Sequence, residues 1–183
     1  MTERRQWMVV GGVIALLASG AFAATRILGD ELVQVSVGSR APEFHALTLD
    51  EVPRGKTLAD YRGEVVLLNI WATYCLPCRV EMPSLERLHS EFAPRGLKVV
   101  AVSIDVPGKE EEIRQFAREY GLTFELLFDE GRTIARDYQT TGVPETIIIG
   151  RDGRIRHKRI GAVHWDSESN RALVASLLAE PAG

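Results

Sequence analysis

The stretch VVLLNIWATYCLPCRVEMPSLERLHSEF, residues 65–92, decides the fold. It opens on a continuous β-prone run from Val65 to Ile70, as expected for a central strand that is covered on both faces. From about Leu76 to Phe92 the apolar residues recur at helical spacing, which predicts a helix that buries one stripe. Cys75 and Cys78 lie where the predicted strand has ended and the predicted helix begins.

The segments after this stretch predict an α/β domain. Leu97 to Ile104 is a second buried strand, so strand, helix and strand form a βαβ unit with a right-handed crossover and parallel strands. Gly38 to Tyr61, before the stretch, contains several turn signals and is assigned no firm structure. The later segments predict a helix at 110–120, a strand at 125–128, a short helix at 132–138, an antiparallel hairpin of 146–149 with 154–160, and a helix at 167–179. We therefore expect a mixed sheet, parallel in its middle, antiparallel at one edge and flanked by helices.

The N-terminus has the composition of a membrane or export segment. Arg4 and Arg5 precede an uncharged run from Trp7 to Ala24. A helix of that length spans about 27 Å, close to the hydrocarbon thickness of a bilayer. The run therefore predicts a membrane anchor or, because Ala21-Phe22-Ala23 resembles a signal-peptidase site, a cleaved signal peptide. A buried N-terminal helix of a cytosolic protein is the remaining alternative.

The sequence therefore predicts two regions, an N-terminal membrane or export segment and an α/β domain. We expect residues 1–35 to form the anchor or signal peptide plus a linker, and residues 36–183 to form the α/β domain. With an anchor, the domain lies on the extracytoplasmic side of the cell membrane; with a cleaved signal, it is periplasmic or secreted. Both compartments permit disulfides.

Composition excludes several classes of function. The chain has 183 residues, with 22 Lys and Arg against 25 Asp and Glu and a formal net charge of −3. This balance provides no global positive field for nucleic acid. Two cysteines cannot build a disulfide-dense scaffold or a four-cysteine zinc site, so they act as one pair.

The position of the cysteine pair favours redox chemistry. A thiol at a helix N-terminus faces unpaired backbone N–H groups and the positive end of the helix dipole, and both favour the thiolate. Cysteines three residues apart on a first helical turn can reach each other. Cys75, the outer one, is expected to attack or be attacked, and Cys78 to resolve the mixed disulfide. No cofactor beyond this redox-active disulfide is expected.

Other roles for the pair fit less well. A structural staple closing so short a loop would stabilise the fold by only about 2 kcal/mol. Attachment of c-type haem needs His directly after the second cysteine, where this chain has Arg79. Zinc would need two more ligands, and the histidines show no paired spacing. A copper metallochaperone carrying the ion on two thiolates remains an alternative, although no Met-rich or His-paired motif accompanies the cysteines. The histidines are His45, His89, His157 and His164.

The segment LLNIWATYCLPCRVEMPSL, Leu67 to Leu85, resembles the active-site segment of the TlpA/ResA/CcmG (DsbE) family of thioredoxin-like, membrane-associated thiol-disulfide oxidoreductases. Similar motifs extend the resemblance over most of the chain outside the N-terminal segment. They are Gly38-x-x-Ala41-Pro42-x-Phe44, Leu58-x-x-Tyr61-x-Gly63, Thr141-Gly142-Val143-Pro144-Glu145-Thr146 and Gly161.

The resemblance implies a thioredoxin-like fold and an exchange activity. Cys75 is then the nucleophile, Cys78 the resolving thiol and Pro144 a cis-proline that faces them. The implied partners are disulfide-bearing proteins, with the CxxCH cysteines of apocytochrome c as substrate, and a membrane thiol electron donor that regenerates the dithiol. The implied direction is reduction, in cytochrome c maturation.

Glu81 is the third candidate catalytic residue. It matches the glutamate that follows the cysteine motif in the ResA-like branch, whereas Asn69 stands where thioredoxin has a buried aspartate. One helical turn places Glu81 on the same face as Cys78, where a carboxylate can relay protons. It can also disfavour a neighbouring thiolate, or be a solvated charge.

Six further residues are candidates for substrate binding. Tyr74 replaces the tryptophan most often found before the first cysteine in the family, and Trp71 is expected to be a wall beneath the motif. Glu145 either tunes the site or is a surface charge. The candidates are Trp71, Tyr74, Pro77, Val143, Pro144 and Glu145.

A thiol peroxidase is the second enzymatic alternative. Gly38 to Phe44 also resembles the start of peroxiredoxin-type chains, and Thr73 stands two residues before Cys75. The flanking Trp71 and Pro77-Cys78 fit disulfide exchange better.

Overall fold

The computed structural model describes residues 3–28 and 35–181, and the chain divides into two units, Met1–Gln34 and Val35–Gly183. In the first unit, α1 (Glu3–Leu28) includes the whole uncharged run. The helix continues through Thr25 to Leu28, beyond the uncharged run. The following residues of the predicted linker, 29–34, lie outside the described residues. Within residues 3–28 and 35–181, no helix combines the length and the apolarity needed to cross a membrane.

The second unit is organised around β3 (Val65–Trp71), every residue of which is buried. β3 pairs in parallel with β4 (Leu97–Ser103), which pairs in parallel with β5 (Glu125–Phe128). On its other side β3 pairs antiparallel with β6 (Glu145–Ile149), and β6 pairs with β7 (Ile155–Ile160). The complete order is β2-β1-β5-β4-β3-β6-β7.

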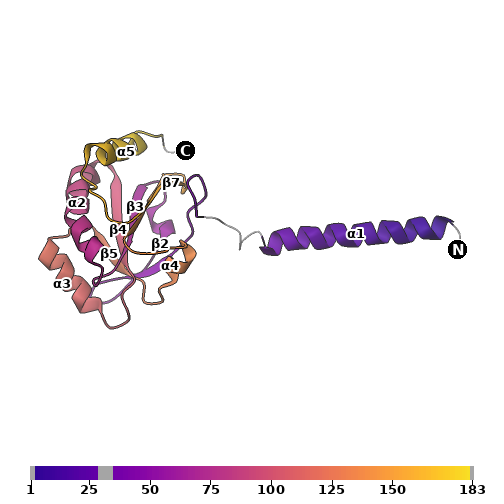
Figure 1. Ribbon diagram of the computed structural model, residues 1–183, viewed down its shortest axis with the longest axis horizontal. Coiled ribbons are helices and arrows are strands. Elements are labelled where there is room, and N and C mark those ends of the chain that lie inside the picture. Colours follow the sequence, from indigo (N-terminus) through magenta and orange to yellow (C-terminus); the bar gives the residue numbers. More distant parts are fainter. Residues whose placement is uncertain (1–2, 29–34, 182–183) are drawn as a thin grey trace. The chain divides into compact units, whose positions relative to one another are not determined.

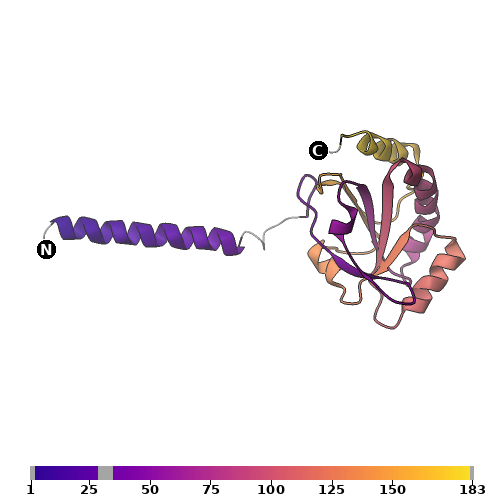
Figure 2. The same cartoon turned by 180° about the vertical axis from the view of Figure 1, so that it is seen from behind.

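Helices cover both faces of this sheet (Figures 1 and 2). α2 (Leu76–Phe92), α3 (Glu110–Tyr120) and α5 (Glu168–Leu178) lie on one side, and the short α4 (Thr133–Asp137) lies on the other. Right-handed crossovers from β3 to β4 and from β4 to β5 run in the same direction along the sheet, so α2 and α3 share a face. The single turn η2 (Ala93–Arg95) connects α2 to β4. The predicted mixed α/β sheet is confirmed.

The second antiparallel edge was not predicted. β1 (His45–Thr48), β2 (Gly55–Thr57) and the turn η1 (Leu58–Tyr61) occupy the segment assigned no firm structure, and β1 pairs antiparallel with both β2 and β5. The sheet is thus antiparallel at both edges, not at one. Strands of four and three residues are too short to show a period of two. Pairing with β5 orders β1, and pairing with β1 orders β2.

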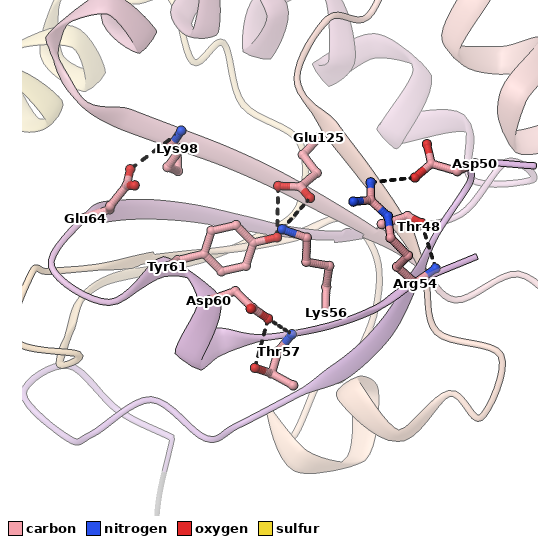
Figure 3. Close-up of polar contacts among 10 residues, drawn as sticks. All are labelled: Thr48, Asp50, Arg54, Lys56, Thr57, Asp60, Tyr61, Glu64, Lys98 and Glu125. Atoms are coloured by element: carbon pink, nitrogen blue, oxygen red, sulfur yellow. Dashed lines mark hydrogen bonds and ion pairs between the residues drawn. The ribbon is translucent and has the colours of Figure 1, made fainter. Parts of the chain in front are cut away.

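Polar contacts fasten this added edge to the start of β5 (Figure 3). The Tyr61 hydroxyl donates to Glu125 Oε2 at 2.9 Å, and Lys56 Nζ lies 3.6 Å from Glu125 Oε1. Burial and the facing Glu125 carboxylate raise the pKa of Tyr61 well above its usual value. The backbone N–H of Thr57 donates to Asp60 at 2.7 Å, which caps η1. These contacts join the first antiparallel pair of strands to the parallel part of the sheet.

Candidate active site

Cys75 and Cys78 form a disulfide at the N-terminus of α2, with their Cα atoms 5.3 Å apart. Cys75 is the N-cap residue, with an extended backbone, and its Sγ accepts the backbone N–H of Cys78 at 3.1 Å. Cys75 is 6% exposed and Cys78 is fully buried. A hydrogen bond to sulfur and the positive end of the helix dipole both stabilise a Cys75 thiolate once the bond opens. The outer sulfur is therefore the one a partner can reach and the one that better holds negative charge.

The loop before β6 lies against this outer sulfur. The Val143–Pro144 peptide bond is cis, and the Val143 carbonyl oxygen is 3.5 Å from Cys75 Sγ. A disulfide sulfur carries no hydrogen, so this is a contact in the oxidised state; a Cys75 thiol could donate to the same oxygen. Pro144 is buried and Val143 is half-buried. The topology thus brings together the cysteine motif and the Gly-Val-Pro-Glu-Thr segment from distant parts of the chain.

Glu81 lies on the inward face of α2 together with Cys78 and is 1% exposed. The indole N–H of Trp165 donates to one carboxylate oxygen, and Asn69 Nδ2 donates to the other at 3.3 Å. Burial raises the pKa of Glu81 from its ordinary value near 4.5 to about 7, although the hydrogen bonds from Trp165, the Val163 backbone and Asn69 oppose the shift. The carboxyl group can therefore both hold and release a proton near neutral pH.

The remaining candidates divide into buried and exposed residues. Trp71 is buried and packs its ring 4.7 Å from that of Phe116 in α3, as a wall beneath the motif. Tyr74 is 62% exposed beside Cys75, and Pro77 is also exposed. These two residues are accessible to a partner, whereas Trp71 is not.

Glu145 lies inside the protein, so it is not a surface charge. It is fully buried, and its Oε1 is 2.9 Å from Lys158 Nζ in β7. Thr146, the next residue, accepts from Asn69 Nδ2 at 2.8 Å on the α2 face. Because successive strand residues point to opposite faces, Glu145 points to the α4 face, where Lys158 also donates to the Tyr138 carbonyl at 3.2 Å.

Three groups of residues near the site were missed from the sequence. Leu76 and Val80, 74% and 64% exposed, extend the apolar surface beside Tyr74. Trp165 holds Glu81, and Asp105 holds the loop before Cys75 through Thr73. Exposed apolar residues at i and i+4 of the motif helix are a signal that could have identified the first group; the others are partners distant in the sequence.

Thr73, on which the peroxidase alternative depends, is hydrogen-bonded to Asp105. Its hydroxyl donates to Asp105 Oδ1 at 2.7 Å. This contact disfavours a role for the hydroxyl at Cys75. Among residues 3–28 and 35–181, no group of three or more His, Cys, Asp or Glu side chains is placed to hold a metal ion.

A buried redox pair at the N-terminus of the first helix of a βαβ unit, facing a cis-proline, defines a thioredoxin-like protein of the disulfide-exchange class. Comparison with known proteins identifies the family within this class. Residues 37–158 match the model of the AhpC/TSA family. The chain is 35% identical over 156 residues to the thiol-disulfide oxidoreductase ResA of Oceanobacillus iheyensis, covering 84% of this chain and 80% of that protein. It is also 35% identical over 160 residues to the thioredoxin-like protein YneN of Bacillus subtilis, covering 87% and 92%.

Solved structures agree with these relatives. A Chlorobium tepidum protein assigned as the thiol:disulfide interchange protein DsbE superposes with a TM-score of 0.70 at 27% identity, covering 79% of this chain and 99% of that one. A thiol:disulfide interchange protein from Bacteroides sp. shares the fold with a TM-score of 0.69 at 23% identity, covering 81% and 93%. The chain belongs to the AhpC/TSA family and, within it, to the TlpA/ResA/CcmG group of thiol-disulfide oxidoreductases.

Proposed function

We propose that this thiol-disulfide oxidoreductase works outside the cytoplasm as a reductant in cytochrome c maturation. Its Cys75 thiolate attacks the disulfide of a partner, apocytochrome c with a CxxCH motif being the substrate. Cys78 then attacks the mixed disulfide, which releases the partner as a dithiol and leaves the Cys75–Cys78 disulfide. A membrane thiol donor returns the two electrons and two protons.

The state of Glu81 is the observation that supports the resolving step of this exchange. Cys78 is fully buried, so its thiol proton needs an internal acceptor before the sulfur can attack the mixed disulfide. Glu81 is on the same inward face one helical turn later, and its pKa is raised to about 7 by burial. A carboxylate with that pKa can take the proton in the resolving step and return it when the pair is reduced again. This assigns Glu81 the proton relay and assigns the two sulfurs the electron transfer.

The N-terminal residues support the location. Arg4 and Arg5 followed by an uncharged stretch are typical of a segment that keeps its N-terminus in the cytoplasm and sends the rest of the chain across the membrane. A fusion of residues 1–40 to alkaline phosphatase, which is active only where disulfides form, tests the export. Carbonate extraction of the full chain then distinguishes an anchored protein from a released one.

A trapping experiment tests the substrate and the roles of the cysteines together. Cys78→Ser should accumulate a mixed disulfide with an oxidised Cys-x-x-Cys-His peptide, while Cys75→Ser should capture none. The control peptide has one of the two cysteines replaced by serine and the other protected as a mixed disulfide with glutathione, so that it lacks the ring. Equal capture of both peptides would remove the preference for apocytochrome c. Normal turnover by Cys78→Ser would overturn the assigned roles.

A further inference from the structure

Every polar group of Thr73 takes part in a hydrogen bond. Its backbone N–H and its hydroxyl both donate to the Asp105 carboxylate, at 2.9 and 2.7 Å. Its carbonyl oxygen accepts from Nε and Nη2 of Arg79, at 3.3 and 3.2 Å. Thr73 precedes Cys75 by two residues and Arg79 directly follows Cys78, so this bond closes the segment that carries both sulfurs. We call Thr73, Asp105 and Arg79 the Thr73 clamp.

Asp105 is itself held rigidly at the end of β4. It is 2% exposed, and it also accepts from the hydroxyl of the fully buried Ser103 at 2.6 Å. The Ser103 hydroxyl in turn accepts the backbone N–H of Asp105 at 3.0 Å. A carboxylate with three donors and almost no contact with water is costly to release, so it fixes the loop to the sheet.

Arg79 is held from the other side. Its guanidinium lies 5.4 Å from the centre of the Phe116 ring in α3, within the range of a cation–π contact. The main chain of the cysteine motif is therefore tied to β4 through Asp105 and packed against α3 through Arg79.

We propose that the Thr73 clamp positions the two sulfurs for each other and so sets the equilibrium between dithiol and disulfide. In the dithiol the sulfurs are no longer bonded, and only the surrounding chain keeps them close. A fixed chain raises the effective concentration of one thiol at the other, which favours closure of the disulfide. A loosened chain makes the disulfide easier to reduce. Asp105 and Arg79 are thus positioning residues that act through the main chain and touch neither sulfur.

The test is equilibration of the purified full-length protein with glutathione. The reaction consumes the Cys75–Cys78 disulfide and two glutathione thiols, and it yields the dithiol and one oxidised glutathione, so its equilibrium constant measures how strongly closure is favoured. Asp105→Ala should shift that constant about tenfold towards the dithiol, which for two electrons is about 30 mV. Thr73→Val, which keeps the size and the N–H but removes the hydroxyl, should shift it in the same direction by less. Thr73→Ser should restore the parent value.

Asp129 supplies the matched control. It is also 2% exposed, it follows the neighbouring strand β5, and it accepts the Ile134 backbone N–H at 2.7 Å and the Thr133 hydroxyl at 3.3 Å. Asp129→Ala should therefore cost comparable stability in urea but leave the glutathione equilibrium within twofold of the parent. A shift equal to that of Asp105→Ala would show a general loss of stability and would overturn the proposal.

The clamp rests on the exchange role proposed for the cysteines but on no particular partner, and the two can fail separately. If the parent sulfurs do not equilibrate with glutathione, the exchange role fails. If the parent equilibrates and the Asp105 and Thr73 variants match it within twofold, only the clamp is wrong. Should Asp105→Ala not fold, Thr73→Val and Arg79→Leu decide. The leucine keeps an apolar stem near Phe116 and removes both donors to Thr73, so it should also shift the equilibrium towards the dithiol.

Discussion

The indole N–H of Trp165 donates to the carboxylate of Glu81, a residue 84 positions earlier in the chain. Both side chains are almost fully buried, and the backbone N–H of Trp165 is bonded to the Ser84 hydroxyl at 3.0 Å. Trp165 is thus attached to α2 twice, on the turn that follows Cys78. The carboxylate keeps its position whether or not it carries a proton, because a hydrogen-bond donor points at it in both states.

The resolving step should follow the ionisation of Glu81. With its pKa near 7, the carboxylate is available as a base above pH 7 and protonated below it. Attack of Cys78 on the mixed disulfide, which releases the partner, should therefore accelerate as pH rises through about 7. Glu81→Gln should remove this inflection and slow the release at pH 8 about 100-fold. Stopped-flow measurement from pH 5 to 9 tests it; a profile identical to the parent would leave Glu81 without a role in proton transfer.

The same carboxyl group should make stability depend on pH. Its pKa is raised on folding, from near 4.5 to about 7, so the stability it permits is fully present below pH 4.5 and is lost as pH rises through 7. The loss is on the order of 3 kcal/mol. Urea unfolding at pH 5 and pH 8 should show this decline in the parent and a much smaller one in Glu81→Gln. Glu91→Gln, an exposed change on the same helix, should keep the parental slope.

The exposed apolar residues beside the cysteines, Leu76 and Val80, form a rim that should select partners without changing the reduction potential of the cysteine pair. Leu76 and Val80 are largely exposed beside Cys75, so replacing either by serine removes surface that only a bound partner can cover. Each substitution should slow the reduction of a protein disulfide about 3- to 10-fold and leave the glutathione equilibrium unchanged. Val52, which is 77% exposed in the β1–β2 connection, gives the control: Val52→Ser should change neither quantity. A rim variant with parental rates on protein substrates would show that the rim makes no contact with them.

Removing only one partner from the ion pair of buried Glu145 with half-buried Lys158 should lower the stability of the fold. Lys158→Met leaves a fully buried carboxylate without its counter-ion and should destabilise the fold by about 3–5 kcal/mol. The double variant Glu145→Gln/Lys158→Met should recover part of that loss. Arg54→Met, which breaks the exposed pair with Asp50, should cost less than about 1 kcal/mol. Chemical denaturation of the four proteins checks this, and equal losses for Lys158→Met and Arg54→Met would contradict it.

The sequence predicts those parts of the fold that have a local period. The bounds expected for α2, Leu76 to Phe92, agree with the structure, because apolar residues on a long amphipathic helix repeat often enough to locate both ends. β1 and β2 have no such repeat; β1 is ordered by pairing with β5, and β2 by pairing with β1. Local pattern is therefore sufficient for the central elements and insufficient for the short edge strands.

The candidate site divides in the same way. Cys75, Cys78 and Glu81 lie within two turns of helix, so their spacing alone places them together. Their partners do not: Trp165 reaches Glu81 from beyond β7, and Asp105 reaches Thr73 from the end of β4. Burial of Glu145 also depends on which face of β6 it takes, and the alternation in a five-residue strand of mostly isoleucine does not define a face.

The arrangement around Thr73 separates two properties that a redox enzyme must adjust. Asp105 and Arg79, which we propose to set its reduction potential, bind the main chain beside the cysteines. Leu76 and Val80, which we expect to contact a partner, are exposed on the first two turns of α2. Mutation of the outer side chains can thus redirect the enzyme to new clients while its driving force stays constant. An engineer could exploit the same division, grafting a different recognition surface onto an unchanged electron donor.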